Sequence, residues 1–438
     1  MKKYNDTWES LDTRSTPEWF KQAKFGIFIH WGIYSVPAFA PRRFEVNDTG
    51  SAYGEWYGWF VREKRERFVR YHKNNYGDAP YEALAEKFKG EKFDADEWAE
   101  LFRKSGAKYI LAVSKHHDGY TLFDSPYSKG WNSLQVGLKR DVIKELFEAC
   151  DRNGLIRGAY YSLMEWPHPV FTGEEMNAVT AEKYALNKMI PEMKELICRY
   201  RPQILYADGE WGFPSSVWHS ENFLQWLYNE SPVRDTIVVN DRWGSDCRGI
   251  HGGYKTCEYG EVNSAAISEE LARENLGKYY WEESRSIGNS FGYNANETAE
   301  DYLGDGELLK LLVGTVADGG NLCLNVGPCA DGTILPLMKE RLSSLGKWLE
   351  INGEAIYGTV GGGEQNGVYL TKKAGIRYYI LFGKPQGNAR IPIEKKVGSV
   401  TLLGFGKVGH YTENNGLTVT LPVGAKLPGE AYVLKVEE

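Results

Sequence analysis

Short apolar segments alternate with amphipathic segments over most of this chain, and no other feature of the sequence limits the fold as strongly. An apolar run of strand length is typical of a strand that is buried on both faces, as in a parallel sheet. The segments that we expect to form such strands are 25–30, 109–114, 156–162, 204–207, 236–240 and 322–326.

Amphipathic stretches lie between these strands, for example at 95–105, 140–153 and 181–199. Parallel strands that alternate with helices over this length favour a (β/α)8-type parallel barrel over an open sheet. An open dinucleotide-binding sheet would carry a glycine-rich phosphate-binding motif after its first strand, and the sequence has none there. The predicted fold class is therefore α/β.

The pattern changes near residue 350. A glycine-rich crossing at 352–367 is followed by short alternating runs at 368–371, 378–382, 399–403, 417–421 and 431–436. Alternation with turn signals at this spacing predicts an antiparallel β-sandwich. We therefore expect two domains, a catalytic β/α barrel at 1–350 and a C-terminal β-sandwich at 351–438.

Charge and hydrophobicity exclude several classes of partner. The 438-residue chain has a net charge of -7 and no stripe of Lys and Arg, so we expect no nucleic-acid partner. No apolar run approaches the ~20 residues of a membrane helix, and no membrane partner is expected. The first residues contain no apolar leader, which indicates a cytoplasmic protein as given, or a periplasmic or secreted one if a leader has been removed. Homo-oligomer formation stays open.

The predicted strand ends carry polar and charged side chains. His30, His116 and Asp208 each follow an apolar run, and Arg242 and Glu258 stand at two further strand ends. The carboxyl ends of the strands in a parallel barrel form the face that bears the active site. A barrel without a site has no reason to gather these groups on one rim, because burying charge is expensive.

Asp208 and Glu258 are the best-placed pair of carboxylates for glycoside hydrolysis. A retaining glycosidase uses one carboxylate as nucleophile and a second as acid/base, roughly 5–5.5 Å apart. Asp208 precedes a glycine that lets the backbone turn, although a strand-end cap or a structural salt bridge would also explain it. Glu258 is less well determined from position alone, because four other glutamates compete for the role: Glu55, Glu165, Glu210 and Glu261.

The adjacent His116 and His117 have two interpretations. Histidine is the commonest metal ligand, but neighbouring residues on a strand point to opposite faces, so the two rarely bind one ion. Hydrogen bonding to the hydroxyl groups of a sugar is the better interpretation, and a backbone-bonded core histidine stays open for one of them. The chain also has 14 Trp and 28 Tyr, which fit either a Trp-rich core or a site that stacks on sugar rings. No metal and no cofactor are expected.

Ten segments of the sequence resemble family 29 of the glycoside hydrolases, the α-L-fucosidases, in order and at family-like spacing. They are AKFGIFIHWGIYSVPA (23–38), GEWY (54–57), KHHDGYTLFDSPYS (115–128), KRDVIKEL (139–146), GAYYSLMEW (158–166), ILYADGEW (204–211), NDRWG (240–244), KTCEY (255–259), IGNSFGYN (287–294) and GGNLCLNVGPCADG (319–332). The resemblance implies a retaining α-L-fucosidase that acts on fucosylated glycans or aryl fucosides by double displacement.

The resemblance also implies roles for single residues. Asp208 matches the family nucleophile and Glu258 the acid/base. Phe291 falls where an aromatic ring covers the C5 methyl group of fucose. The residues that fall on positions that hold the sugar are His30, Glu55, Trp56, His116, His117, Tyr160 and Arg242.

Four alternatives remain at this point. The loops around 123–133 and 158–166 resemble the broad-specificity branch, and the alternative within the family is an α-1,3/1,4-restricted fucosidase. Outside it, the chain could be a metal-dependent barrel hydrolase, a non-catalytic fucose-binding protein, or a glycosidase acting on β-galactosides or other fucose-like sugars.

Overall fold

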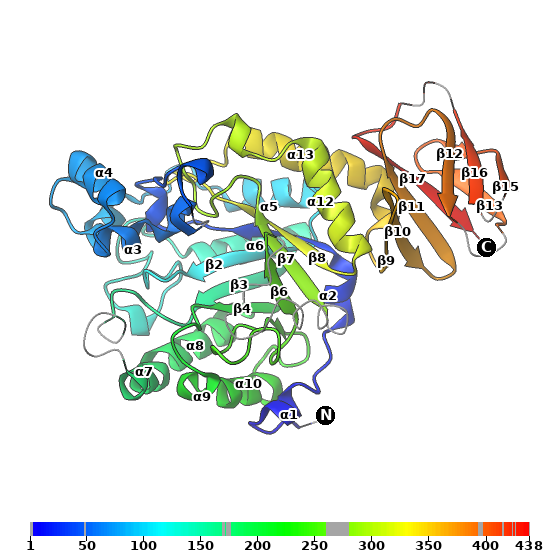
Figure 1. Cartoon of the computed structure of the whole chain (residues 1–438). Coiled ribbons are helices and arrows are strands. Elements are labelled where there is room, and N and C mark those ends of the chain that lie inside the picture. The colour runs from blue at the N-terminus through cyan, green and yellow to red at the C-terminus, as the bar shows by residue number, and fades with distance from the viewer. Residues whose placement is uncertain are drawn as a thin grey trace.

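The computed structural model describes residues 3–47, 50–168, 171, 177–259, 280–392, 397–413, 416–422, 424 and 426–437. Its larger part is an eight-stranded parallel sheet with strand order β5-β4-β3-β2-β1-β8-β7-β6, curved into a barrel and surrounded by helices (Figure 1). This confirms the predicted barrel. The strands are β1 Phe25–Ile29, β2 Tyr109–Lys115, β3 Ile156–Ser162, β4 Ile204–Asp208, β5 Val238–Val239, β6 Lys255–Glu258, β7 Trp281–Ser286 and β8 Asn321–Val326.

Two helix ends show clear caps that the sequence provides. The Asp94 side chain accepts hydrogen bonds from two backbone N–H groups at the start of α5, and Gly154 ends α6 in the left-handed conformation. The expected helix at 181–199 is α7 and α8 joined by a π-helical turn, Ala185–Met189. The helices are α1 Trp8–Leu11, α2 Glu18–Ala23, α3 Tyr57–Arg62, α4 Glu66–Tyr76, α5 Ala95–Lys104, α6 Val142–Asn153, α7 Ala178–Tyr184, α8 Ile190–Tyr200, α9 Ser215–Trp218, α10 Ser220–Asn229, α12 Asp305–Ala317 and α13 Pro336–Asn352.

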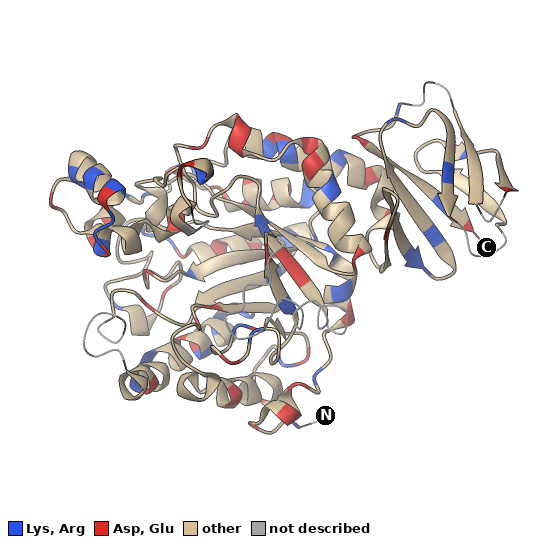
Figure 2. Ribbon diagram, viewed as in Figure 1, with Lys and Arg blue, Asp and Glu red and all other residues tan. Residues whose placement is uncertain are grey.

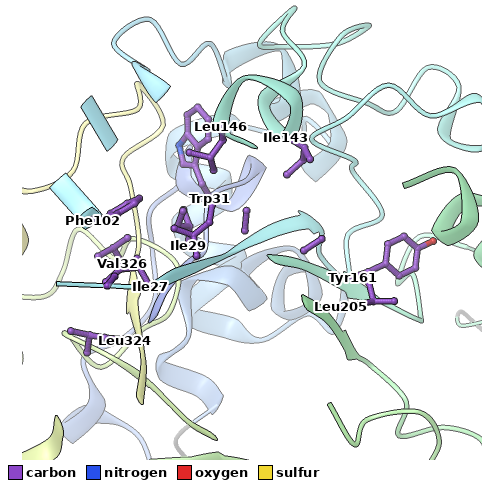
Figure 3. Close-up of a cluster of buried hydrophobic side chains, with 14 of the residues drawn as sticks. Ile27, Ile29, Trp31, Phe102, Ile143, Leu146, Tyr161, Leu205, Leu324 and Val326 are labelled. Atoms are coloured by element: carbon purple, nitrogen blue, oxygen red, sulfur yellow. The ribbon is translucent and has the colours of Figure 1, made fainter. Parts of the chain in front are cut away.

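Alternation along each strand separates the barrel interior from the layer beneath the helices. Ile27 and Ile29 of β1 belong to the large cluster between strands and helices, together with Leu324 and Val326 of β8 (Figure 3). Phe28, between the two isoleucines, belongs to a separate cluster inside the barrel. The residue that continues the inward series at the end of β1 is His30, so the same alternation aims a polar side chain into the barrel mouth.

The barrel closes between β5 and β6 through backbone hydrogen bonds just outside the strands. The N–H groups of Gly253 and Tyr254 donate to the carbonyl oxygens of Asn240 and Val239, at 3.0 and 3.1 Å. A Cβ atom on Gly253 would lie 1.8 Å from the Val239 carbonyl oxygen, so only glycine fits there. This seam therefore rests on a two-residue strand and a glycine contact.

Strand β7 was absent from the apolar runs of the sequence, and its composition explains why. Its segment WEESRS carries two adjacent glutamates, which colour this strand red among mostly tan strands in Figure 2. Glu282 points to the barrel interior, where the Tyr109 hydroxyl donates a hydrogen bond to it. Hydrogen bonding to a buried carboxyl group here replaces the apolar burial that usually marks a strand.

The C-terminal part is an antiparallel sandwich, as predicted, with sheet orders β14-β13-β17-β11-β10-β9 and β12-β16-β15. Tyr379 and Leu434 belong to the core between the two sheets, whereas the adjacent Tyr378 and Val433 belong to the cluster that includes the barrel helices. One face of the large sheet is thus buried against the barrel. The strands are β9 Val360–Gln365, β10 Val368–Lys373, β11 Ile376–Phe382, β12 Gly387–Pro392, β13 Ser399–Leu402, β14 Gly406–Lys407, β15 His410–Glu413, β16 Gly416–Leu421 and β17 Ala431–Glu437.

Within the described residues, no helix combines the length and the apolar character that crossing a lipid bilayer would require.

Candidate active site

A pocket opens at the carboxyl ends of the barrel strands. All ten residues that the sequence analysis singled out line it, and four more complete its wall. The lining residues are Phe28, His30, Tyr53, Glu55, Trp56, His116, His117, Tyr160, Tyr206, Asp208, Trp211, Arg242, Glu258 and Phe291. The structure therefore brings the predicted residues together in one place.

Asp208 is the last residue of β4 and lies deep in this pocket. Its Oδ2 accepts a hydrogen bond from the Tyr160 hydroxyl at 2.7 Å, and its Oδ1 one from Arg242 Nη1 at 2.8 Å. Gly209 follows with φ +74°, which turns the chain away from the strand and leaves the carboxylate at its end. Burial alone would raise the pKa of Asp208, but the charge of Arg242 and the two hydrogen bonds hold it well below its usual range. Asp208 is thus an ionised carboxylate.

Arg242 is a buried cation that joins two carboxylates. Its Nη1 donates to Asp208 and its Nη2 donates to Oε1 of Glu258. Its Nε donates to the Thr256 hydroxyl at 3.1 Å, and that hydroxyl donates to Oδ1 of Asp241 at 2.7 Å. The guanidinium is therefore fixed on three sides, and it binds one carboxylate at each of its two terminal nitrogens.

The two carboxylates differ in their surroundings. The Asp208 side chain is 12% exposed, whereas the Glu258 side chain is 24% exposed. Glu258 ends β6 and has a second cation, Arg248, at 3.8 Å. Asp208 is thus the inner carboxylate, and Glu258 stands nearer the pocket mouth, where it can exchange protons.

A β-bulge explains how both His116 and His117 reach the pocket. The register between β2 and β3 shifts between Val113 and Lys115, which turns Lys115 to the outside of the barrel. The strand ends there, and the histidines lie in the turn that follows, with ring centroids 4.2 Å apart. The strict alternation assumed from the sequence does not apply to them, because they are no longer in a strand.

His30 and His117 are each oriented by a hydrogen bond at Nδ1, and Nε2 of His117 lies 3.6 Å from Oδ2 of Asp208. His117 Nδ1 lies 2.6 Å from the Ser162 hydroxyl, which itself donates to the Met164 carbonyl oxygen, so Nδ1 carries the proton and Nε2 is an acceptor. His30 Nδ1 likewise lies 2.7 Å from Oδ1 of Asn325. Burial lowers the pKa of His30 to about 3 and that of His117 to about 4, so both are neutral near pH 7.

Glu55 is a second kind of carboxyl group in the pocket wall. Its Oε2 accepts hydrogen bonds from the Gly292 N–H at 2.7 Å and from the Ser290 hydroxyl at 3.4 Å, which ties it to the loop that carries Phe291. Burial raises the pKa of Glu55 to about 8, because those hydrogen bonds offset only part of the desolvation. Glu55 is therefore neutral near pH 7 and can donate a hydrogen bond.

Two of the glutamates that competed with Glu258 lie outside the pocket wall. Glu165 is bound to Lys115 Nζ at 2.7 Å and to Lys188 Nζ at 2.6 Å in a buried network behind the histidines. Glu210 is buried beside Asp208, and its Oε2 has no hydrogen-bond partner in the part of the chain that the structure describes. Burial raises the pKa of Glu210 to about 7. Glu261 lies outside the described residues.

Four lining residues escaped the sequence analysis. Phe28 precedes His30 by two positions, and Tyr206 precedes Asp208 by two positions. Side chains two apart on a strand point to the same face, so both residues could have been predicted from the sequence. Tyr53 and Trp211 lie in loops, where no periodicity applies. Trp211 follows Asp208 by three residues and ends the segment ILYADGEW, and these were the available signals for it.

The described residues contain no group of three or more His, Cys, Asp or Glu side chains arranged to hold a metal ion. The absence of a metal requirement stays a prediction.

Comparisons with known proteins agree on one family. The α-L-fucosidase family model matches residues 1–354. The plasma α-L-fucosidase of Rattus norvegicus is 41% identical over 436 residues, covering 96% of this chain and 90% of its own. The human tissue α-L-fucosidase is 38% identical over 434 residues, covering 96% and 88%. The crystal structure of Thermotoga maritima α-fucosidase in complex with fucose has a TM-score of 0.82 at 34% identity, covering 99% of this chain and 100% of that one.

The raised pKa of Glu55 predicts a pH-dependent contribution to stability. Between about pH 4.3, where an unfolded glutamate ionises, and about 8, the folded protein retains a proton that the unfolded chain releases, so stability falls as pH rises. The slope for one such group is at most about 1.4 kcal/mol per pH unit. Glu55→Gln keeps an acceptor for Gly292 and cannot ionise, so its Tm relative to wild type should increase from pH 5 to pH 8 in calorimetry.

The control is Glu63→Gln, at an exposed position of the same region, whose Tm should follow wild type at every pH. A constant difference between Glu55→Gln and wild type across this range would contradict a neutral Glu55.

Proposed function

Because the chain belongs to the α-L-fucosidase family and is a glycoside hydrolase, we propose that it cleaves terminal α-L-fucosides with retention, with Asp208 as nucleophile and Glu258 as acid/base. The observation that carries this assignment is the convergence of the two carboxylates on Arg242. Carboxylates that share one guanidinium are separated by a short distance, which suits the retaining pair of roughly 5–5.5 Å better than the wider inverting pair.

The environments of the two groups support their separate roles. A nucleophile must be ionised, and Arg242 and Tyr160 stabilise the charge of Asp208. An acid/base must exchange a proton with the leaving oxygen and with water, and Glu258 is the more exposed of the two. Different environments for two nearby carboxyl groups are the usual way in which enzymes divide acid and nucleophile roles.

In the first step, Asp208 attacks the anomeric carbon while Glu258 gives its proton to the leaving oxygen, and the glycosidic C–O bond breaks. A β-linked fucosyl-enzyme results. In the second step, Glu258 removes a proton from water, whose oxygen attacks the anomeric carbon as the bond to Asp208 breaks. The product is α-fucose, and both carboxyl groups return to their initial states.

The other lining residues suit a neutral, hydroxyl-rich sugar. Neutral His30 and His117 each offer an acceptor nitrogen, and neutral Glu55 offers a donor. We assign His116, Tyr160, Trp56 and Arg242 to the same sugar. Phe291, whose ring lies 5.0 Å from that of His30, provides an apolar surface for the C5 methyl group, and one methyl group is worth only ~1–3 kcal/mol of discrimination.

We also propose that residues 1–350 form the catalytic domain and residues 351–438 a supporting sandwich. All pocket residues lie between positions 28 and 291, and the sandwich buries one face of its large sheet against the barrel. The substrate is a fucosylated glycan or aryl fucoside, with broad acceptance of linkages.

Asp208→Gly should abolish the first step. We expect turnover of 4-nitrophenyl α-L-fucoside to fall by several orders of magnitude, because no carboxylate attacks the anomeric carbon. Azide should restore part of the rate and give β-fucosyl azide, which NMR identifies. Asp124→Gly is the matched control, because Asp124 pairs with Arg199 outside the pocket and its loss should leave turnover intact. Wild-type turnover in Asp208→Gly would contradict the assignment.

Glu258→Ala should affect substrates according to their leaving groups. General acid catalysis is worth about 10²–10⁴-fold. We expect kcat/KM for methyl α-L-fucoside to fall by that factor and kcat/KM for 2,4-dinitrophenyl α-L-fucoside to fall far less. Glu210→Gln tests the other buried glutamate that could serve as the acid, and it should affect kcat/KM for both substrates equally. A loss that depends on the leaving group in Glu210→Gln but not in Glu258→Ala would transfer the acid role to Glu210.

A further inference from the structure

Trp211 differs from every other tryptophan of the chain. The sequence has 14 tryptophans, all of them within the described residues, and Trp211 alone is exposed, at 41%. It also lines the active-site pocket. An exposed tryptophan at the mouth of a pocket leaves a large apolar surface in water, which a bound ligand can cover.

The backbone around Trp211 is fixed. Glu210, the preceding residue, is buried, and its carbonyl oxygen accepts hydrogen bonds from Trp218 Nε1 at 3.1 Å and from the Phe213 N–H at 3.4 Å. Trp211 therefore extends from an anchored turn three residues after Asp208, and its position relative to the nucleophile is set by the fold.

Aromatic neighbours pack against the indole ring of Trp211. The rings of Trp211 and Trp56 are nearly parallel, at 26° with centroids 5.7 Å apart, and the His117 ring lies 5.2 Å from Trp211. Trp56 in turn contacts Trp166 at 5.2 Å. A ring held by such a stack keeps its orientation when a ligand binds, so little side-chain entropy is lost.

The indole N–H of Trp211 is available to donate a hydrogen bond to a ligand. Trp211 Nε1 has no hydrogen-bond partner anywhere in the described ranges. An exposed aromatic surface with a free donor at its edge suits a pyranose ring, which presents an apolar C–H face and hydroxyl groups around its rim.

We propose that Trp211 forms the subsite for the group to which fucose is attached, a pyranose of the glycan or the ring of an aryl fucoside. This inference rests on the proposed function, because the fucosyl group would occupy the buried part of the pocket. The leaving group must then lie on the open side, where Glu258 protonates its oxygen. Trp211 and Glu258 both border the pocket, so binding on Trp211 would hold that oxygen near its acid.

The test compares two substrates that share fucose and differ in the leaving group. 4-Nitrophenyl α-L-fucoside carries a flat ring that can stack, and α-L-fucosyl fluoride carries a single atom that cannot. Trp211→Ala should lower kcat/KM for the aryl fucoside by roughly 3- to 10-fold, the size of one aromatic contact. The value for the fluoride and the inhibition constant of free fucose should stay within about 2-fold of wild type.

Two further variants support the interpretation. Trp211→Phe keeps an aromatic surface and should recover most of the aryl-fucoside activity. Phe405→Ala removes an aromatic side chain that is 56% exposed in the sandwich and should change neither substrate.

Equal losses on both substrates in Trp211→Ala would overturn the proposal, because they would place Trp211 at the fucose itself. Unchanged kcat/KM for the aryl fucoside would also overturn it. Failure of the wild type to hydrolyse either substrate would refute the proposed function and the subsite with it, whereas wild-type activity with no selective loss refutes the subsite alone.

Discussion

The buried guanidinium of Arg242 is the group on which both the site and the barrel around it depend. An unpaired cation in this position would be very costly, and truncating one partner of a buried ion pair typically costs about 3–5 kcal/mol. Arg242 follows β5, and its carboxylate partners end β4 and β6. The three groups therefore span the place where the barrel is joined by a two-residue strand and by the close contact at Gly253. Asp208, which we assign to the chemistry as an ionised carboxylate, thus also neutralises the charge that links these strands.

The rest of the pocket is polar but carries little charge, which follows from burial. Desolvation keeps His30 and His117 neutral and keeps Glu55 protonated near pH 7. A neutral imidazole can donate from one nitrogen and accept at the other, whereas an imidazolium can only donate. Neutral groups of this kind match the hydroxyl groups of a sugar, each of which both donates and accepts. They also leave Arg242 as the principal partner of the Asp208 charge.

Whether a strand could be predicted from the sequence depended on whether its buried side chains are apolar or polar. Strands such as β1 and β8 were evident from sequence because apolar residues face the helices and the barrel interior is largely aromatic or aliphatic. Strand β7 was not, because Glu282 is buried by hydrogen bonding rather than by apolar contact. In the sandwich, the glycine-rich segment at 352–367, which was expected to be a crossing between the domains, contains strand β9, which pairs antiparallel with β10.

The site was more predictable than the loops around it. Asp208 and Arg242 follow apolar strands, and the geometry of a parallel barrel places such residues at one mouth. His116 and His117 reach the pocket through a bulge that no periodicity reveals. The position of Trp211 depends on a turn that Trp218 anchors through a hydrogen bond to the Glu210 carbonyl oxygen. No pattern of strand ends in the sequence reveals such a turn. Periodicity could thus place the residues at the ends of regular strands, whereas it gave no information on loop residues such as Tyr53 and Trp211.

The stereochemistry of the reaction shows whether Asp208 acts as a nucleophile in a double displacement. Proton NMR can follow 4-nitrophenyl α-L-fucoside with the purified protein and record which anomer of fucose forms before mutarotation mixes them. A double displacement through Asp208 predicts that α-fucose accumulates first. Early accumulation of β-fucose would mean a single displacement by water and would contradict the role given to Asp208.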